Sequence, residues 1–112
     1  MGTQDALSAA LKEVRDGLRG IFGDSLENVF LYGSYARGEQ DDESDIDILA
    51  VVELSAETLD EYEGAVLDLA FELGLRYDAL FSVLLQDAAT FRKYARSMPF
   101  FLNVLREGIS LV

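Results

Sequence analysis

Asp45 and Asp47 are the residues of this 112-residue chain whose type and spacing point most directly to chemistry. They open the run Asp45–Val52, which alternates as a strand does and is otherwise apolar. At positions i and i+2 of a strand, both carboxylates point to one side, roughly 7 Å apart. Two anions on one face repel each other and are costly to desolvate, so a hard divalent cation such as Mg²⁺ would stabilise them. The alternative is a pair of acids at a solvent-exposed strand start.

A glycine-serine pair lies upstream and points to phosphate binding. Gly33 follows the apolar run Asn28–Tyr32, which we predict to be a buried strand, and Ser34 then begins a short turn or helix. Free backbone N–H groups at such a turn bind anions, and a serine hydroxyl adds a further donor. Arg37 could reach the same pocket with its planar guanidinium group. The segment lacks the Gly-Lys-Ser/Thr ending of a Walker A loop, and a lone Gly-Ser is equally typical of an ordinary turn.

The combined pattern is much more specific than either part. Gly33-Ser34, ten intervening residues and Asp45-x-Asp47 resemble the signature of the nucleotidyltransferase superfamily that includes DNA polymerase beta and kanamycin nucleotidyltransferase. The fuller Gly-Ser-x-Ala-Arg-Gly and Ser-Asp-Ile-Asp-Ile are similar to the minimal nucleotidyltransferase (MNT) branch of bacteria and archaea. The strand before Gly33 and the segment 99–109 also resemble that branch. The resemblance therefore implies one polymerase beta-like nucleotidyltransferase domain over residues 1–112.

The resemblance also implies a metal site. Asp45 and Asp47 would hold two Mg²⁺ ions, with Mn²⁺ as the alternative, and a third acid on a later strand would complete the site. Asp78 is the candidate, because we predict an apolar strand from Arg76 to Leu85 around it. Asp78 as a surface acid at a strand end is the competing interpretation. Glu72 is a second candidate for the third ligand, although its helical position favours the surface.

Three residues would handle the nucleotide in this interpretation. Gly33 and Ser34 would contact the phosphates, as the resemblance implies. Arg37 would offset charge on the triphosphate, or would instead buttress the loop through the acids at 41, 42 and 43. Asp78 could also act as the base that activates the acceptor hydroxyl.

Substrate and partner follow from the same resemblance. MNT proteins are often encoded beside HEPN-domain proteins, and many such pairs are toxin–antitoxin systems. The MNT antitoxin moves AMP from ATP onto a tyrosine of the HEPN toxin. We therefore expect a HEPN-domain partner and a homo- or hetero-oligomer. The alternatives are an interaction module that inhibits by binding alone, and nucleotidyl transfer to a small molecule such as an aminoglycoside.

Composition excludes several other classes of function. The chain has neither histidine nor cysteine, which removes imidazole bases, thiolate metal sites and disulfides. Its net charge of −12 disfavours binding to a nucleic-acid backbone. No apolar run is long enough to span a bilayer and no signal peptide is recognisable, so we expect a cytoplasmic protein.

The pattern of elements predicts an α/β (α+β) domain with a small mixed sheet flanked by helices. After a first helix that ends at Gly23 come the two strands named above. Ser55 is expected to cap a long helix that Gly74 stops, and the strand Arg76–Leu85 follows. Asp87 and Pro99 are expected to begin two more helices, the second of which ends near Gly108, and the tail 109–112 could be an edge strand.

Overall fold

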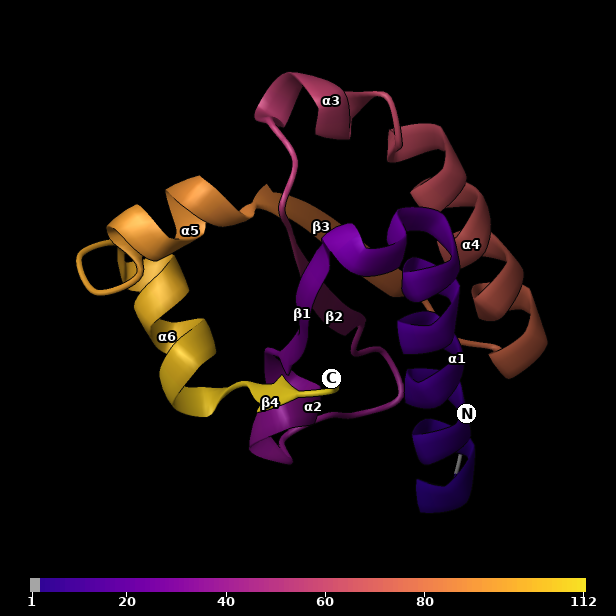
Figure 1. The fold of residues 1–112 in the computed structure, drawn as a ribbon. Coiled ribbons are helices and arrows are strands. Elements are labelled where there is room, and N and C mark those ends of the chain that lie inside the picture. The colour runs from indigo at the N-terminus through magenta and orange to yellow at the C-terminus, as the bar shows by residue number, and fades with distance from the viewer. Residues whose placement is uncertain (1–2) are drawn as a thin grey trace.

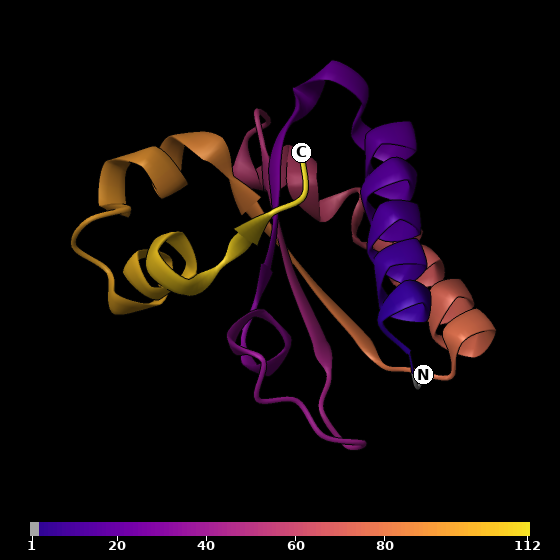
Figure 2. The ribbon, with the colours of Figure 1, turned by 90° about the horizontal axis from the view of Figure 1, so that it is seen from below.

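The computed structural model describes residues 3–112 as a four-stranded sheet between two layers of helices (Figures 1 and 2). Seen along the sheet in Figure 2, α1 and α4 cover one face, and α5 and α6 cover the other. In chain order the elements are α1 (Gln4–Phe22), η1 (Gly23–Ser25), β1 (Leu26–Tyr32), α2 (Ser34–Arg37), β2 (Ile46–Val52), α3 (Ala56–Asp60), α4 (Glu63–Tyr77), β3 (Phe81–Asp87), α5 (Ala88–Tyr94), α6 (Pro99–Glu107) and β4 (Ile109–Ser110).

The sheet is mixed, as the sequence predicts. Its strand order is β3-β2-β1-β4. β1 runs antiparallel to both β2 and β4, whereas β2 and β3 are parallel and are joined through α3 and α4. The predicted tail strand is confirmed as β4, which pairs with β1 at the edge of the sheet.

Strand β2 separates two cores. Ile46 and Ile48 pack, with the other even-numbered residues of β2, into the core beneath α1 and α4. Leu49 and Val51 pack into the second core, against α5 and α6. The predicted alternation is confirmed within Ile46–Val52, and Asp47 falls on the second face. The strand itself begins at Ile46, so Asp45 lies immediately before it.

Local signals located most helix ends correctly. α1 ends at Gly23, and the side chain of Asp87 caps α5 by accepting a hydrogen bond from the backbone N–H of Thr90 at 2.9 Å. Pro99 starts α6, which ends at Gly108. Within residues 3–112, none of the helices has the length and apolar character needed to cross a membrane.

Ser55 caps a helix as predicted, but the single helix predicted from Ser55 to Gly74 is wrong in its continuity and at its C-terminal end. Ser55 caps only the short α3, and the chain turns at residues 61–62 before α4 begins. Gly74 lies inside α4 instead of ending it. A glycine is needed at this position because the chain folds back closely over the helix. A Cβ at Gly74 would come within 2.7 Å of the carbonyl oxygen of Ala79.

The strand predicted from Arg76 is also wrong, since β3 begins at Phe81. Arg76 and Tyr77 belong to the last turn of α4, where both contact the carboxylate of Glu13 on the adjacent α1. Such long-range contacts favour helix over the strand propensity of the local sequence. Asp78 then ends α4 with φ 51° and ψ 53°, a left-handed conformation that aspartate tolerates better than most residues.

Candidate active site

Antiparallel pairing of β1 and β2 brings the two halves of the motif together. Tyr32, the last residue of β1, pairs with Asp47. Gly33 and Ser34 follow Tyr32 directly and therefore lie at the end of the sheet where β2 starts with its two aspartates. The ten residues that separate Ser34 from Asp45 form α2 and a loop, which carry the chain back to the same place.

Gly33 is required by the position of Asp47. Its backbone has φ 78° and ψ −154°, a region that residues with a side chain rarely enter. A Cβ at Gly33 would also overlap the carboxylate of Asp47. The glycine thus lets the turn lie directly against one of the two aspartates.

The turn after Gly33 is a short helix. The N–H groups of Ala36 and Arg37 both donate to the carbonyl of Gly33, at 3.1 and 3.2 Å. Ser34 begins this helix α2 and is half-buried, and Gly38 ends it in a left-handed conformation. The predicted short turn or helix at Ser34 is confirmed.

A closed turn presents Asp45 to the start of β2. The side chain of Asp41 accepts a hydrogen bond from the N–H of Glu43 at 2.9 Å, and the N–H of Asp41 donates to the hydroxyl of Ser44 at 3.0 Å. The N–H of Ser44 donates in return to the carbonyl of Asp41 at 3.2 Å. These bonds set the direction in which the chain enters β2, although the loop tip is exposed to solvent.

The electrostatics of Asp47 fit a cation site. Partial burial raises the pKa of the Asp47 carboxyl above its ordinary value, the negative charge of Asp45 raises it further, and Arg37 opposes the shift. Burial and the charge of Asp47 also raise the pKa of Tyr32. A positive charge beside Asp45 and Asp47 would therefore be stabilised.

The two carboxylates fit Mg²⁺, which commonly takes one or two protein carboxylates together with water and phosphate oxygens. Within residues 3–112, no group of three or more acidic, histidine or cysteine side chains is arranged to hold a metal ion. The chain thus provides a two-carboxylate site that the phosphates of a nucleotide would complete.

Arg37 lies near this site but has different partners from those predicted for it as a buttress. Its Nε donates to Glu39 at 2.6 Å, and its Nη1 lies 3.5 Å from a carboxylate oxygen of Glu107. The suggested contacts with the acids at 41, 42 and 43 are therefore wrong. Both ion pairs are exposed, and such pairs contribute little to stability, so little free energy opposes a rearrangement of Arg37 toward a triphosphate.

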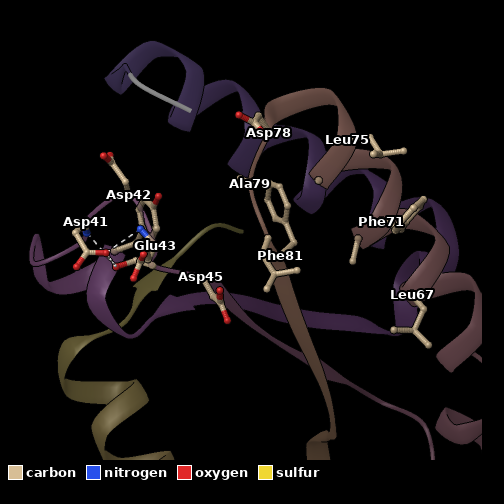
Figure 3. A pocket seen from close by; sticks show the side chains of 15 residues that line it. Asp41, Asp42, Glu43, Asp45, Leu67, Phe71, Leu75, Asp78, Ala79 and Phe81 are labelled. Atoms are coloured by element: carbon tan, nitrogen blue, oxygen red, sulfur yellow. Dashed lines mark hydrogen bonds between the residues drawn. The ribbon is translucent and has the colours of Figure 1, made fainter.

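Asp78 does not occupy the strand position predicted for it. In the parallel register of β2 and β3, the residue paired with Asp47 is Ser82, and Asp78 precedes it by four residues. Figure 3 shows Asp78 at the end of α4, above Ala79 and apart from Asp45, although both acids line one cavity. The geometry gives no support to a third carboxylate at Asp78. Glu72 is exposed and pairs with Arg76, which confirms its predicted surface location.

Ser82 is the residue near the aspartates that sequence reasoning missed. Phe81 and Val83 pack toward α1 and α4, so Ser82 shares the face of its register partner Asp47. Within Phe81–Leu85, Ser82 is a polar residue among apolar neighbours, and this contrast was the indication that the sequence offered. It could be interpreted only with the register of β3 against β2, which the sequence did not provide.

Replacing Asp78 with glycine separates the two possible roles of this residue. Glycine adopts the left-handed conformation at no steric cost, so we expect α4 to end at the same position and the protein to stay folded. We also expect nucleotidyl transfer to stay within about threefold, well short of the 10²-fold or greater loss that follows removal of a transition-state contact. Thermal unfolding and initial rates measure the two effects. A fall in rate of a hundredfold or more, with the fold retained, would restore Asp78 as a metal-binding residue.

A cavity of about 770 Å³ lies beside Asp45. One wall is the acidic loop that contains Asp41, Asp42 and Glu43, and the other is the exposed side of α4 with the start of β3. The size is sufficient for a nucleotide-sized molecule or for side chains of another protein. The cavity is therefore continuous with Asp45, one of the two carboxylates of the candidate site.

Comparison with known proteins identifies this arrangement. The profile of the nucleotidyltransferase domain family matches residues 11–103, which include both motif halves. Two proteins of Methanocaldococcus jannaschii, described as candidate protein adenylyltransferases, are similar to the chain. One is 33% identical over 99 residues, covering 88% of this chain and 91% of the relative. The other is 39% identical over 75 residues, covering 67% of this chain and 74% of the relative.

Solved structures share the fold. A structure described as a candidate minimal nucleotidyltransferase superposes with a TM-score of 0.60 at 25% identity, covering 94% of this chain and 92% of that one. The MNT antitoxin complex with a tri-AMPylated HEPN toxin of Shewanella oneidensis gives 0.55 at 21% identity, covering 94% and 71%. From the family match, the relatives and the site at the β1–β2 junction, we conclude that the chain belongs to the nucleotidyltransferase domain family and has the fold of the minimal nucleotidyltransferases.

Proposed function

We propose that this protein transfers the AMP group of ATP to a hydroxyl group of a partner protein. The observation that carries the proposal is the assembly of Gly33-Ser34 against Asp45 and Asp47 by the pairing of β1 with β2. The two relatives described as candidate protein adenylyltransferases support AMP as the group and protein as the acceptor. We place the reaction in the cytoplasm, where ATP is supplied.

Each motif residue has a distinct part in the proposed reaction. Asp45 and Asp47 would hold Mg²⁺ or Mn²⁺, which when bound neutralises the triphosphate and lowers the pKa of the acceptor hydroxyl. Ser34 and the backbone at the start of α2 would donate hydrogen bonds to phosphate oxygens. Arg37 would leave Glu39 and Glu107 to offset the remaining charge. The acceptor oxygen bonds to the α-phosphorus as the bond to pyrophosphate breaks, and the hydroxyl proton leaves to water.

The proposed acceptor is a tyrosine of a HEPN-domain toxin, and this protein would be its antitoxin. The described chain consists of the catalytic sheet and its covering helices, and the cavity beside Asp45 is open for a side chain from outside. The Shewanella oneidensis complex pairs an MNT antitoxin with an AMPylated HEPN toxin on a similar fold, which supports such a partner.

The test is label transfer. The purified protein is incubated with α-³²P-ATP and Mg²⁺, with and without the product of the neighbouring gene, beside an Asp45→Asn/Asp47→Asn variant. We expect label on the neighbour that disappears with the variant. Label on a small molecule instead would move the acceptor to another class, and no label with any of the four NTPs despite complex formation would leave a binding module.

A further inference from the structure

Helix α4 has a second apolar side that faces solvent. Leu67, Phe71 and Leu75 follow one another at four-residue steps, and 66%, 70% and 72% of their surfaces are exposed. Figure 3 shows the three side chains in a row along the helix. Val66 and Leu73 on the same helix already supply its buried contacts with the sheet and α1. The exposed stripe thus takes no part in the core of the described chain, and contiguous exposed apolar surface of this kind marks interaction sites.

The stripe is continuous with the candidate active site. Leu67, Phe71 and Leu75 line the same cavity as Asp45, together with Leu80, of which 64% is exposed. The facing wall is the acidic loop. Among the described residues, the 15 that line this cavity include no basic side chain. A molecule seated on the stripe would therefore contact apolar side chains on one side and carboxylates on the other, next to the reacting nucleotide.

Charge decides which kind of protein fits this surface. A second copy of the chain would place the same acidic loop and another net charge of −12 against the first, and like charges across an interface are costly. A partner with apolar side chains ringed by lysine and arginine would satisfy both walls. The charges thus favour a basic heterologous partner over a homodimer on this face.

We propose that the α4 stripe, comprising Leu67, Phe71 and Leu75, is the docking surface for the acceptor protein, and that the partner covers it with an apolar patch bordered by basic residues. This inference rests on the proposed function, because it assumes a protein acceptor. Docking there places the acceptor hydroxyl at the mouth of the cavity that Asp45 lines. The surface would thereby select the partner and orient it for transfer.

The test measures binding apart from transfer. Leu67→Ser/Phe71→Ser/Leu75→Ser is introduced into the Asp45→Asn/Asp47→Asn protein, and its Kd for the HEPN-domain product of the neighbouring gene is measured by calorimetry. We expect binding to weaken by at least about thirtyfold, because hot spots of an interface are its buried large apolar side chains. The matched control is Met98→Ser/Leu105→Ser, two residues with 42% and 44% exposure at the start of and within α6, on the opposite face of the sheet. This control should keep the original Kd.

A second variant guards against loss of folding in the first. Phe71→Lys changes one exposed helical residue and places a cation against the apolar patch of the partner, near its basic border, so it should also weaken binding. Unchanged binding in both stripe variants, or a wild-type protein that does not bind this partner, would overturn the docking proposal. Sedimentation provides a further criterion. If the wild type forms a dimer and the triple serine variant is a monomer, the stripe binds a second copy of the chain and the docking proposal is overturned. Stripe-dependent binding without any AMP transfer would instead overturn the proposed function and leave the docking surface in place.

Discussion

Asp47→Asn should reduce nucleotidyl transfer on the order of a thousandfold while making the nucleotide-free protein more stable at neutral pH. The loss of activity follows from removing one of two carboxylates that hold the charge of the metal and nucleotide. The gain in stability follows because burial and the neighbouring charge of Asp45 disfavour the ionised form of Asp47. Asparagine has the same shape without the charge. One substitution should therefore move activity and stability in opposite directions.

The sign of the pH dependence follows from the raised pKa of Asp47. A carboxyl group whose pKa is higher in the folded protein contributes full stability below its unfolded pKa, near 4, and that contribution is lost as the pH rises through the folded value. The stability advantage of Asp47→Asn should thus be largest at pH 8 and shrink as the pH falls through the raised pKa of Asp47 toward the unfolded value near 4. Thermal unfolding at a series of pH values measures it.

Ligand and charge controls separate this effect from a general change in net charge. Asp60→Asn makes the same charge change on α3, which follows the other end of β2, and should leave transfer unaltered. Saturating Mg²⁺ with a non-hydrolysable ATP analogue should stabilise the wild type by about 2.7 kcal/mol at a hundred times Kd, and Asp47→Asn by much less. An Asp47→Asn protein that is less stable than the wild type at pH 8 would contradict our account of the site.

Gly33→Ala is expected to damage both the fold and the reaction. Forcing a side chain into this positive-φ conformation costs about 1–3 kcal/mol of the free energy of unfolding. The new Cβ would also displace the carboxylate of Asp47, and a displacement of about 1 Å in a catalytic group can lower the rate a hundredfold. Chemical denaturation and initial rates of transfer, with α-labelled ATP, measure the two losses.

Gly20→Ala is the matched control for this substitution. Gly20 lies in α1, and a Cβ there meets nothing within 4 Å. Because alanine favours helix over glycine, this variant should gain about 0.5–1 kcal/mol of stability and retain full activity. A Gly33→Ala protein with wild-type rates would show that the turn can move away from Asp47 without consequence.

The parts of the site that were predictable are those encoded within single elements. Alternation along residues 45–52 placed Asp47 on the face opposite Ile46 and Ile48, which the two cores confirm. Gly33 was predicted to end a strand and Ser34 to begin a short turn or helix, and the structure has both features. Each of these features depends on backbone preferences within a few residues, so the local sequence was sufficient to predict them.

The incorrect predictions concern segments whose structure depends on contacts with distant parts of the chain. The segment from Arg76 to Leu80 was predicted as strand, yet contacts of Arg76 and Tyr77 with Glu13 on α1 keep its first part helical. The error about Gly74 has a similar origin, since the glycine is there to admit the carbonyl of Ala79. Asp78 therefore lies at the end of a helix and not within a strand, as the sequence had predicted.

The sequence by itself determined which residues form the candidate site, because the types and local geometry of the Gly-Ser and Asp-x-Asp segments already carry the turn and the paired carboxylates to which we assign phosphate and metal binding. The tertiary structure decided which other groups lie around them. The parallel register of β2 and β3 placed Ser82, not Asp78, beside Asp47, and the packing of α4 left Leu67, Phe71 and Leu75 in solvent beside the cavity. Register and helix orientation depend on the sum of many weak contacts between elements far apart in the chain, and no short stretch of sequence contains that sum.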